Sequence, residues 1–442
     1  MATPADVIRA ILKAPVDLLW FGGIGTYIKS QEQRHGDVGD KSNDAVRVDA
    51  NQVRACVIGE GANLGVTQAG RVEFARRGGR INTDAIDNAG GVDCSDHEVN
   101  IKILLDSAVT SGALTREDRN ALLVDMTESV AGLVLANNYA QTLTLTLAER
   151  SAHEDLEAHK RMMRDFERRK LLDRGVEGLP SDEGLAELKN AGRGLTRPEL
   201  AVLMAYAKNI LLDQLVASDV PDDPALRPRL LAYFPEILSA RFADFAPSHR
   251  LHREIIATQL ANEIVNEAGI PFVHRLIEGL GAEPSLGARA FVVADAILNV
   301  ENLRSRINAL DNSVKATLQT DLHRRIMKAL WHQSRWLLRY AVRKRNGSLT
   351  LPIGDTMKRY LPAARDHFSA IAATLPAELT KHAAAEEKEL AQAGVQTDLA
   401  RDVVNLQFMA PIGDIVDIAD RTGCATDVTS SVYFSLGVKY NI

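Results

Sequence analysis

Three polar side chains in the first 100 residues have the chemistry and the setting to bind a small ligand. Asn63 lies in "CVIGEGANLGVTQAG" (residues 56–70), and Asn88 and Ser95 lie in "IDNAGGVDCSDHEV" (residues 86–99). An amide both donates and accepts hydrogen bonds, and so does a hydroxyl. Asparagine is also a common turn residue, but two asparagines that both stand beside glycine clusters indicate a shared ligand groove.

Glycines surround these side chains, and 13 of the 30 in the chain fall in the first 100 residues. Gly59, Gly61 and Gly65 stand where an apolar run ends. Glycine tolerates positive φ and lets a ligand approach the backbone, whereas it weakens the middle of a strand. Ligands of open α/β sheets bind just beyond the carboxyl ends of the strands. The turn after this run is therefore predicted to be the floor of a ligand site.

Ser95 has two interpretations. Val92, Ser95, Val99 and Ile103 are spaced to share one helix face, so the hydroxyl is predicted to point inward. It could simply bond back to a carbonyl one turn earlier, which is common. Alternatively it faces a ligand near the helix N-terminus at residues 88–91, where free N–H groups and the helix dipole favour a carboxylate or a phosphate.

The elements that position these residues are short strands and glycine-rich loops. Apolar runs broken by glycine predict buried strands in residues 14–24 and 53–65. A short helix is predicted from Thr67 to Ala75, and "RINTDAI" (residues 80–86) is predicted to be another strand. This succession is typical of the last strands, in chain order, of a parallel sheet.

From about residue 91 the apolar period becomes helical, and Thr115 and Thr196 are predicted helix caps. The predicted fold is therefore an α/β segment followed by a mainly helical region, predominantly α overall. The predicted domains are residues 1–112 and 113–442, with possible breaks near 171–195 and 345–356.

Composition excludes several classes of protein. A net charge of −6 argues against a nucleic-acid-binding or anionic-membrane surface. No apolar run is long enough to span a membrane, and the amino end lacks the pattern of a secretory signal, so we expect a cytoplasmic protein. Three cysteines without CxxC spacing predict neither a disulfide framework nor structural zinc, and no metal site is predicted.

The two ligand-site stretches resemble a known family. "VIGEGANLGVT" is similar to the glutamate dehydrogenase stretch Glu-Gly-Ala-Asn-Gly-Pro-Thr-Thr, and "IDNAGGVDCSDHEV" is similar to that family's Asn-Ala-Gly-Gly-Val-Thr-Val-Ser-Tyr-Phe-Glu-Trp. "LLWFGGIGTYIKS" and "LTRPELAVLMAYAK" look more closely like the large bacterial NAD-specific glutamate dehydrogenases. The resemblance covers most of the chain and places it in the carboxyl-terminal portion of such an enzyme.

The resemblance implies a fold and a set of site residues. Residues 1–90 would be the last strands of a Rossmann-like dinucleotide-binding domain, and the later residues a helical carboxyl-terminal domain. NAD would be the cofactor, and L-glutamate and 2-oxoglutarate the substrate and product. Ser95 would bind a carboxylate of glutamate. The residues at the cofactor would be Gly22, Gly23, Gly61, Asn63 and Asn88.

The resemblance also places the family's catalytic lysine and aspartate upstream of this chain. Our first hypothesis is therefore a part of an NAD-dependent glutamate dehydrogenase, homo-oligomeric as a whole and inactive as this chain alone. The alternative is a helical oligomerisation or regulatory module without catalysis of its own. A third possibility is another amino-acid dehydrogenase of the superfamily, although an apolar substrate side chain would leave the Ser95 hydroxyl unpaired.

Overall fold

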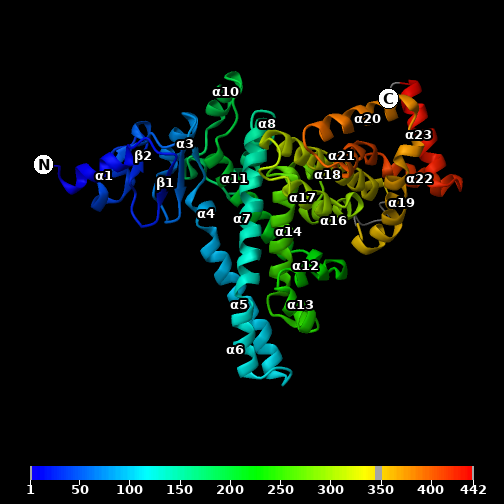
Figure 1. The fold of residues 1–442 in the computed structure, drawn as a ribbon, viewed down its shortest axis with the longest axis horizontal. Helices are drawn as coiled ribbons and strands as arrows, with labels where there is room; N and C mark the ends of the chain where they lie inside the picture. The colour runs from blue at the N-terminus through cyan, green and yellow to red at the C-terminus, as the bar shows by residue number, and fades with distance from the viewer. Residues whose placement is uncertain (1, 344–350, 441–442) are drawn as a thin grey trace. The chain divides into compact units, whose positions relative to one another are not determined.

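The computed structural model describes residues 2–343 and 351–440, which are mainly helical (Figure 1). The chain packs into two compact units, Met1–Asp213 with Arg227–Pro271, and Gln214–Leu226 with Phe272–Ile442. Parallel strands precede a long succession of helices, which confirms the predicted fold class. The predicted domain boundary near residue 112 falls inside the first unit and stays a prediction, because a compact unit and a functional domain are different things.

The first unit begins with helix α1 (Pro4–Leu12) and two small parallel sheets. Strands β1 (Leu18–Phe21), β4 (Val57–Glu60) and β5 (Arg80–Ile81) form one sheet in the order β1-β4-β5. Strands β2 (Ile28–Lys29) and β3 (Val48–Asp49) form the other. Both strands predicted within residues 14–24 and 53–65 are thus confirmed.

The strand predicted over residues 80–86 is right only for its first two residues. Helix α4 (Asp84–Asp87) follows β5 almost at once. Asp87 accepts hydrogen bonds from the Asn82 side chain (2.6 Å) and the Glu60 amide (2.9 Å). These bonds turn the chain back toward β4, so the pairing with the sheet ends at Ile81.

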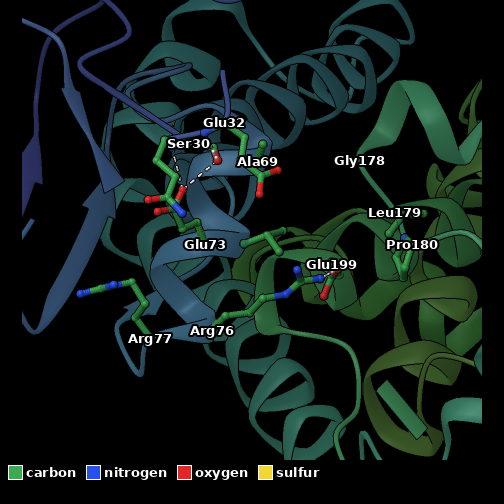
Figure 2. A pocket seen from close by; sticks show the side chains of 12 residues that line it. Ser30, Glu32, Ala69, Glu73, Arg76, Arg77, Gly178, Leu179, Pro180 and Glu199 are labelled. Carbon is green, nitrogen blue, oxygen red and sulfur yellow. Dashed lines mark hydrogen bonds and ion pairs between the residues drawn. The ribbon is translucent and has the colours of Figure 1, made fainter. Parts of the chain in front are cut away.

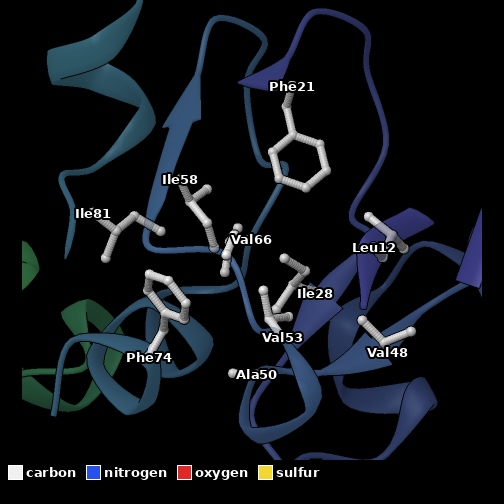
Figure 3. Close-up of a cluster of buried hydrophobic side chains, with 11 residues drawn as sticks. Leu12, Phe21, Ile28, Val48, Ala50, Val53, Ile58, Val66, Phe74 and Ile81 are labelled. Atoms are coloured by element: carbon white, nitrogen blue, oxygen red, sulfur yellow. The ribbon is translucent and has the colours of Figure 1, made fainter. Parts of the chain in front are cut away.

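Helix α3 (Gln68–Arg76) covers one face of the sheet. The Thr67 hydroxyl accepts a hydrogen bond from the Gly70 amide (3.0 Å), which confirms the predicted cap. Phe74 of α3 packs beside Ile58 and Ile81 in the buried core (Figure 3). The whole cluster comprises Leu12, Phe21, Ile28, Val48, Ala50, Val53, Ala55, Ile58, Val66, Phe74 and Ile81.

We predict that Gly79→Ala destabilises this core by about 1–3 kcal/mol, the usual cost of overpacking. A Cβ at Gly79 would overlap the ring of Phe74, which is buried and cannot move aside. Gly132→Ala is the matched control, because a Cβ there meets nothing within 4 Å on an exposed helix face. Urea unfolding of both variants checks the prediction, and equal midpoints would contradict it.

The rest of the first unit is helical. Helices α5 (Ala89–Thr110) and α7 (Thr127–Arg150) run side by side (Figure 1). Thr115 accepts a hydrogen bond from the Asp118 amide (3.1 Å), which confirms that cap. At Thr196 the half of the predicted capping box that the structure shows is the Thr196 amide donating to the Glu199 carboxylate (2.7 Å). The other helices are α2 (His35–Val38), α6 (Arg116–Asp125), α8 (Leu156–Arg168), α9 (Arg174–Glu177), α10 (Asp182–Asn190), α11 (Arg197–Val216, ending in the second unit), α12 (Arg227–Ala232), α13 (Glu236–Arg241) and α14 (His252–Ala268).

The second unit packs around α16, which contacts α18 and α19 and buries Phe291 completely. The break predicted at 345–356 lies mostly outside the described residues, and α19 begins within it at Ile353. The helices are α15 (Phe272–Ile277), α16 (Pro284–Leu298), α17 (Val300–Asn308), α18 (Ala316–Arg343), α19 (Ile353–Thr374), α20 (Ala377–Gln392), α21 (Thr397–Asn405), α22 (Ile412–Thr422) and α23 (Thr426–Tyr440).

None of the helices in the described part of the chain combines the length and the apolar character that crossing a bilayer requires.

Candidate functional site

The loops that follow β1 and β4 meet at one edge of the sheet. Phe21 pairs with Glu60 in register, so Gly22 and Gly61 leave adjacent strands at the same level. The Ala62 amide donates a hydrogen bond to the Phe21 carbonyl (3.0 Å) and ties the second loop to the first. This edge is the carboxyl edge of a parallel sheet, where ligands bind in folds of this kind.

Asn63 and Asn88 come together at this edge. The Asn88 side-chain amide donates a hydrogen bond to the Asn63 side-chain oxygen. Asn88 lies between α4 and α5, so this bond joins the loop after β4 to the start of α5. Nδ2 of Asn63 and Oδ1 of Asn88 are the groups left to bond a ligand. The structure thus brings together the two asparagines that the sequence singled out.

A buried ion pair holds the loop of residues 60–66, which carries Asn63. Glu60, at the end of β4, is fully buried, and Arg71 of α3 donates two hydrogen bonds to its carboxylate (2.6 and 2.9 Å). The Val66 amide also donates to Glu60 (2.9 Å), which closes the loop from residue 60 to residue 66. Burial raises the pKa of Glu60, and the bonds from Arg71 oppose that rise.

Asp84 fixes the exposed tip of the same loop. Leu64 has a positive φ of 60° and donates its amide to the Asp84 carboxylate (2.8 Å). Asp84 also pairs with Arg71 (3.2 Å). Sequence reasoning missed this acidic and basic framework. The signal that could have found it is the charged Glu60 at the end of an apolar run.

Gly61 has a packing role that needs no ligand. A Cβ at Gly61 or at Gly59 would lie 2.5 Å from the Trp20 ring, so both glycines make room for this tryptophan. Gly22 also has Trp20 as its nearest neighbour, at 3.9 Å. Gly23 differs, because a Cβ there would meet nothing within 4 Å. Whether these glycines bind a cofactor stays a prediction.

Ser95 does not point inward as its predicted stripe implied. Its side chain is exposed, as are Val92 and Val99, whose exposed fractions are 72% and 54%. The Ser95 hydroxyl donates to the Val92 carbonyl (2.7 Å), which is the predicted bond back to a carbonyl one turn earlier and not the ligand-facing interpretation. The reason is that α5 buries a different face, with Ile101 and Leu104. Substrate binding by Ser95 stays a prediction, now for an outward-facing hydroxyl.

A polar cluster on the buried face of α5 holds the helix in place. The Tyr233 hydroxyl donates to the Asp96 carboxylate (2.7 Å) and accepts from the Asn100 side chain (2.9 Å). The His97 ring stacks on Tyr233 with 4.5 Å between centroids. Burial raises the pKa of Tyr233 and lowers the pKa of His97, so both stay neutral near pH 7. Sequence reasoning missed this cluster, although "SDHEVN" places polar residues on that face.

Two family models match the chain. "Bacterial NAD-glutamate dehydrogenase, catalytic domain" matches residues 1–148, and "Glutamate dehydrogenase, C-terminal" matches residues 192–442. The strands, the paired asparagines and Ser95 all fall within the first match.

Curated relatives match along almost the whole chain. An NAD-specific glutamate dehydrogenase of Pseudomonas aeruginosa is 46% identical over 98% of this chain and 26% of its own length. Proteins of the same description from Halomonas elongata and Mycobacterium tuberculosis are each 42% identical, over 100% and 98% of this chain and 27% and 26% of their own lengths. The chain thus spans about a quarter of the length of these relatives.

Proposed function

The chain belongs to the bacterial NAD-specific glutamate dehydrogenase family, and from that premise we propose that it forms one wall of such an enzyme's catalytic cleft together with its helical carboxyl-terminal region. The reaction is the oxidative deamination of L-glutamate to 2-oxoglutarate and ammonia, in the cytoplasm. The observation that carries this proposal is the contact between Asn63 and Asn88 at the carboxyl edge of the sheet.

The residues at this edge suit NAD, which when bound supplies the hydride acceptor. Gly22 and Gly23 follow β1 as an exposed turn with open space at Gly23. Asn63 and Asn88 each present a polar amide atom that can bond a ribose hydroxyl or a carboxamide. Gly61 leaves room for the ring of Trp20, a residue that is 57% exposed. These residues bind and orient, whereas proton transfer is assigned to the lysine and aspartate expected upstream.

Ser95 is proposed to hold a carboxylate of glutamate. Ser95 lies seven positions after Asn88, which is about two helical turns, so both face the same side of α5. The Ser95 hydroxyl would exchange the Val92 carbonyl for the substrate, an exchange its exposure allows. Its role is to position the substrate for hydride transfer, which depends on holding the two carbons at reacting distance.

We expect Ser95→Ala in the full-length enzyme to raise the KM for glutamate about 10- to 100-fold, the value of one hydrogen bond to a charged group. The KM for NAD should stay unchanged, because Asn63 and Asn88 remain. Steady-state kinetics with each substrate varied in turn measures both constants. Ser107→Ala is the matched control on the same helix, since its hydroxyl also bonds back to the backbone. An unchanged KM for glutamate would exclude the assigned role.

The 442-residue chain by itself is expected to have no turnover, because the proposed acid and base lie outside it. Purified chain incubated with glutamate and NAD should form no NADH above a blank that lacks enzyme, measured by absorbance. Glutamate-dependent NADH formation would refute this part of the proposal.

A second candidate function is oligomer assembly, favoured by the last described helix. Val428, Val432 and Leu436 form an apolar stripe on α23 at four-residue spacing, with exposed fractions of 53%, 54% and 47%. Such a stripe is typical of a helix that packs against a partner. Light scattering separates the candidates, since an assembly module self-associates without upstream sequence.

A further inference from the structure

A cavity of about 380 Å³ lies in the first unit, between α3, the chain after β2, and the loop joining α9 to α10 (Figure 2). One face of α3 lines it with Ala69, Val72, Glu73 and Arg76. Its volume is in the range of small-molecule sites. It shares no residue with the Asn63 and Asn88 site, so the proposed reaction does not account for it.

Glu73 is the polar group that the protein leaves incomplete in this cavity. One carboxylate oxygen, Oε2, accepts hydrogen bonds from the Ser30 hydroxyl (2.7 Å) and the Gln31 amide (2.8 Å). The other oxygen, Oε1, is buried and has no hydrogen-bond partner in the structure. Buried polar atoms are normally paired, so Oε1 would gain a hydrogen bond if the Glu73 side chain turned it toward a donor in the adjacent cavity.

The charges around the cavity favour a cation. Glu32 and Glu73 make no ion pair with any side chain in the described residues. Arg76 forms an ion pair with Glu199 (3.3 Å). Arg77 points away from the other labelled side chains in Figure 2. The wall formed by Glu32 and Glu73 therefore carries negative charge that no ion pair within the described residues balances, while Arg77 lies at another part of the lining.

The remaining surface is apolar. Val72 lies beside Glu73 on α3, and Leu179 and Pro180 form the opposite side in Figure 2. A ligand that suits both surfaces has an N–H-rich cationic head for Glu73 and a short hydrocarbon stem for Val72, Leu179 and Pro180.

We propose that this cavity binds a primary alkylammonium group. The ammonium donates to the Glu73 carboxylate, whose Oε1 turns into the cavity to accept it, and the alkyl stem packs on Val72, Leu179 and Pro180. The group can come from a free amine or from a lysine side chain of another protein. The site is independent of the catalytic assignment, since it uses none of the residues proposed for glutamate or NAD.

Isothermal titration of the 442-residue chain with n-butylammonium chloride tests the proposal, with butan-1-ol as the neutral probe of equal length. We expect saturable binding of n-butylammonium and at least tenfold weaker binding of butan-1-ol. Glu73→Gln should weaken n-butylammonium binding about tenfold or more, as loss of a charged hydrogen bond does. Glu128→Gln, the same change on an exposed residue of α7, should leave it unchanged.

A second variant tests the same cavity without changing Glu73, in case Glu73→Gln does not fold. Ala69→Leu fills the cavity from an exposed helical position and suits a helix. It should abolish binding while the midpoint of urea unfolding stays unchanged. Repeating the titration with N-acetyl-lysine amide separates the two sources: tighter binding than n-butylammonium indicates a lysine of a partner, and weaker binding a free amine. Equal binding by butan-1-ol, or full affinity in Glu73→Gln, would overturn the proposal.

Discussion

Glu60→Gln should lower the free energy of unfolding of the first unit by about 3–5 kcal/mol, the usual cost of breaking a buried ion pair from one side. The Glu60 and Arg71 side chains are only 0% and 6% exposed, so water cannot replace the lost partner. Glutamine keeps the shape of the side chain but has no negative charge to balance the positive charge of the Arg71 guanidinium. The Val66 amide would also lose a charged acceptor.

A double-mutant cycle separates the ion pair from simple loss of packing. Arg71→Met should cost a similar amount, because it leaves the Glu60 carboxylate buried and unpaired. The Glu60→Gln/Arg71→Met double variant should lose clearly less than the sum of the two single losses, since neither position of the buried pair then carries an unpaired charge. The loss of the Asp84 contact is common to both Arg71 variants and does not change this comparison. Urea unfolding gives each value.

The exposed pair between Glu98 and Lys102 provides the control. Both side chains are about half exposed, so Glu98→Gln should cost far less than Glu60→Gln. If Glu60→Gln costs no more than Glu98→Gln, the ion pair does not hold the loop. The proposed ligand edge would then depend on Asp84 and Asp87 alone.

The features that sequence predicted well are those that a few neighbouring residues determine. Thr67 caps α3 through the amide three residues on, and Thr115 caps α6 in the same way. The meeting of Asn63 and Asn88 is a longer-range feature, yet it was predictable because parallel strands end at a common edge.

The features that sequence could not predict depend on partners far along the chain. Helix α5 has apolar residues on two faces, with Val92 and Val99 on one and Ile101 and Leu104 on the other. Periodicity alone does not say which face meets α7, so the prediction for Ser95 chose the wrong one.

The role of Gly61 was hidden for the same reason. Its need for glycine comes in part from the Trp20 ring, which a neighbouring strand brings across it. A glycine at a strand end is compatible with both a ligand and a close aromatic contact, and only the sheet register distinguishes them.

Lys208→Met should raise the free energy of unfolding of the first unit by about 2–4 kcal/mol at pH 7. Nζ of Lys208 is buried and has no hydrogen-bond partner among the described residues, and burial lowers the pKa of this lysine from 10.5 to about 7. Met204 and Leu211, one turn away on the same face of α11, are buried and apolar. Methionine matches the stem of the lysine and carries no charge, so it suits this environment.

The sign of the pH dependence follows from the lowered pKa. Between about pH 7 and 10.5 the unfolded chain holds the Lys208 proton and the folded chain does not, so the stability contributed by this group rises with pH. The difference in the free energy of unfolding between Lys208→Met and the parent should therefore fall to about 1 kcal/mol near pH 9.5. Taking the difference between the two proteins at each pH cancels groups that titrate equally in both.

Lys189→Met is the control that isolates burial. Lys189 is 56% exposed and pairs with Glu157, so its replacement should change the free energy of unfolding by less than about 1 kcal/mol at either pH. Urea unfolding at both pH values, with hydrogen exchange in α11 to identify the unit that opens, measures all three proteins. If Lys208→Met is no more stable than the parent at pH 7, the amine is not buried as a neutral group, and its charge must be balanced within the fold.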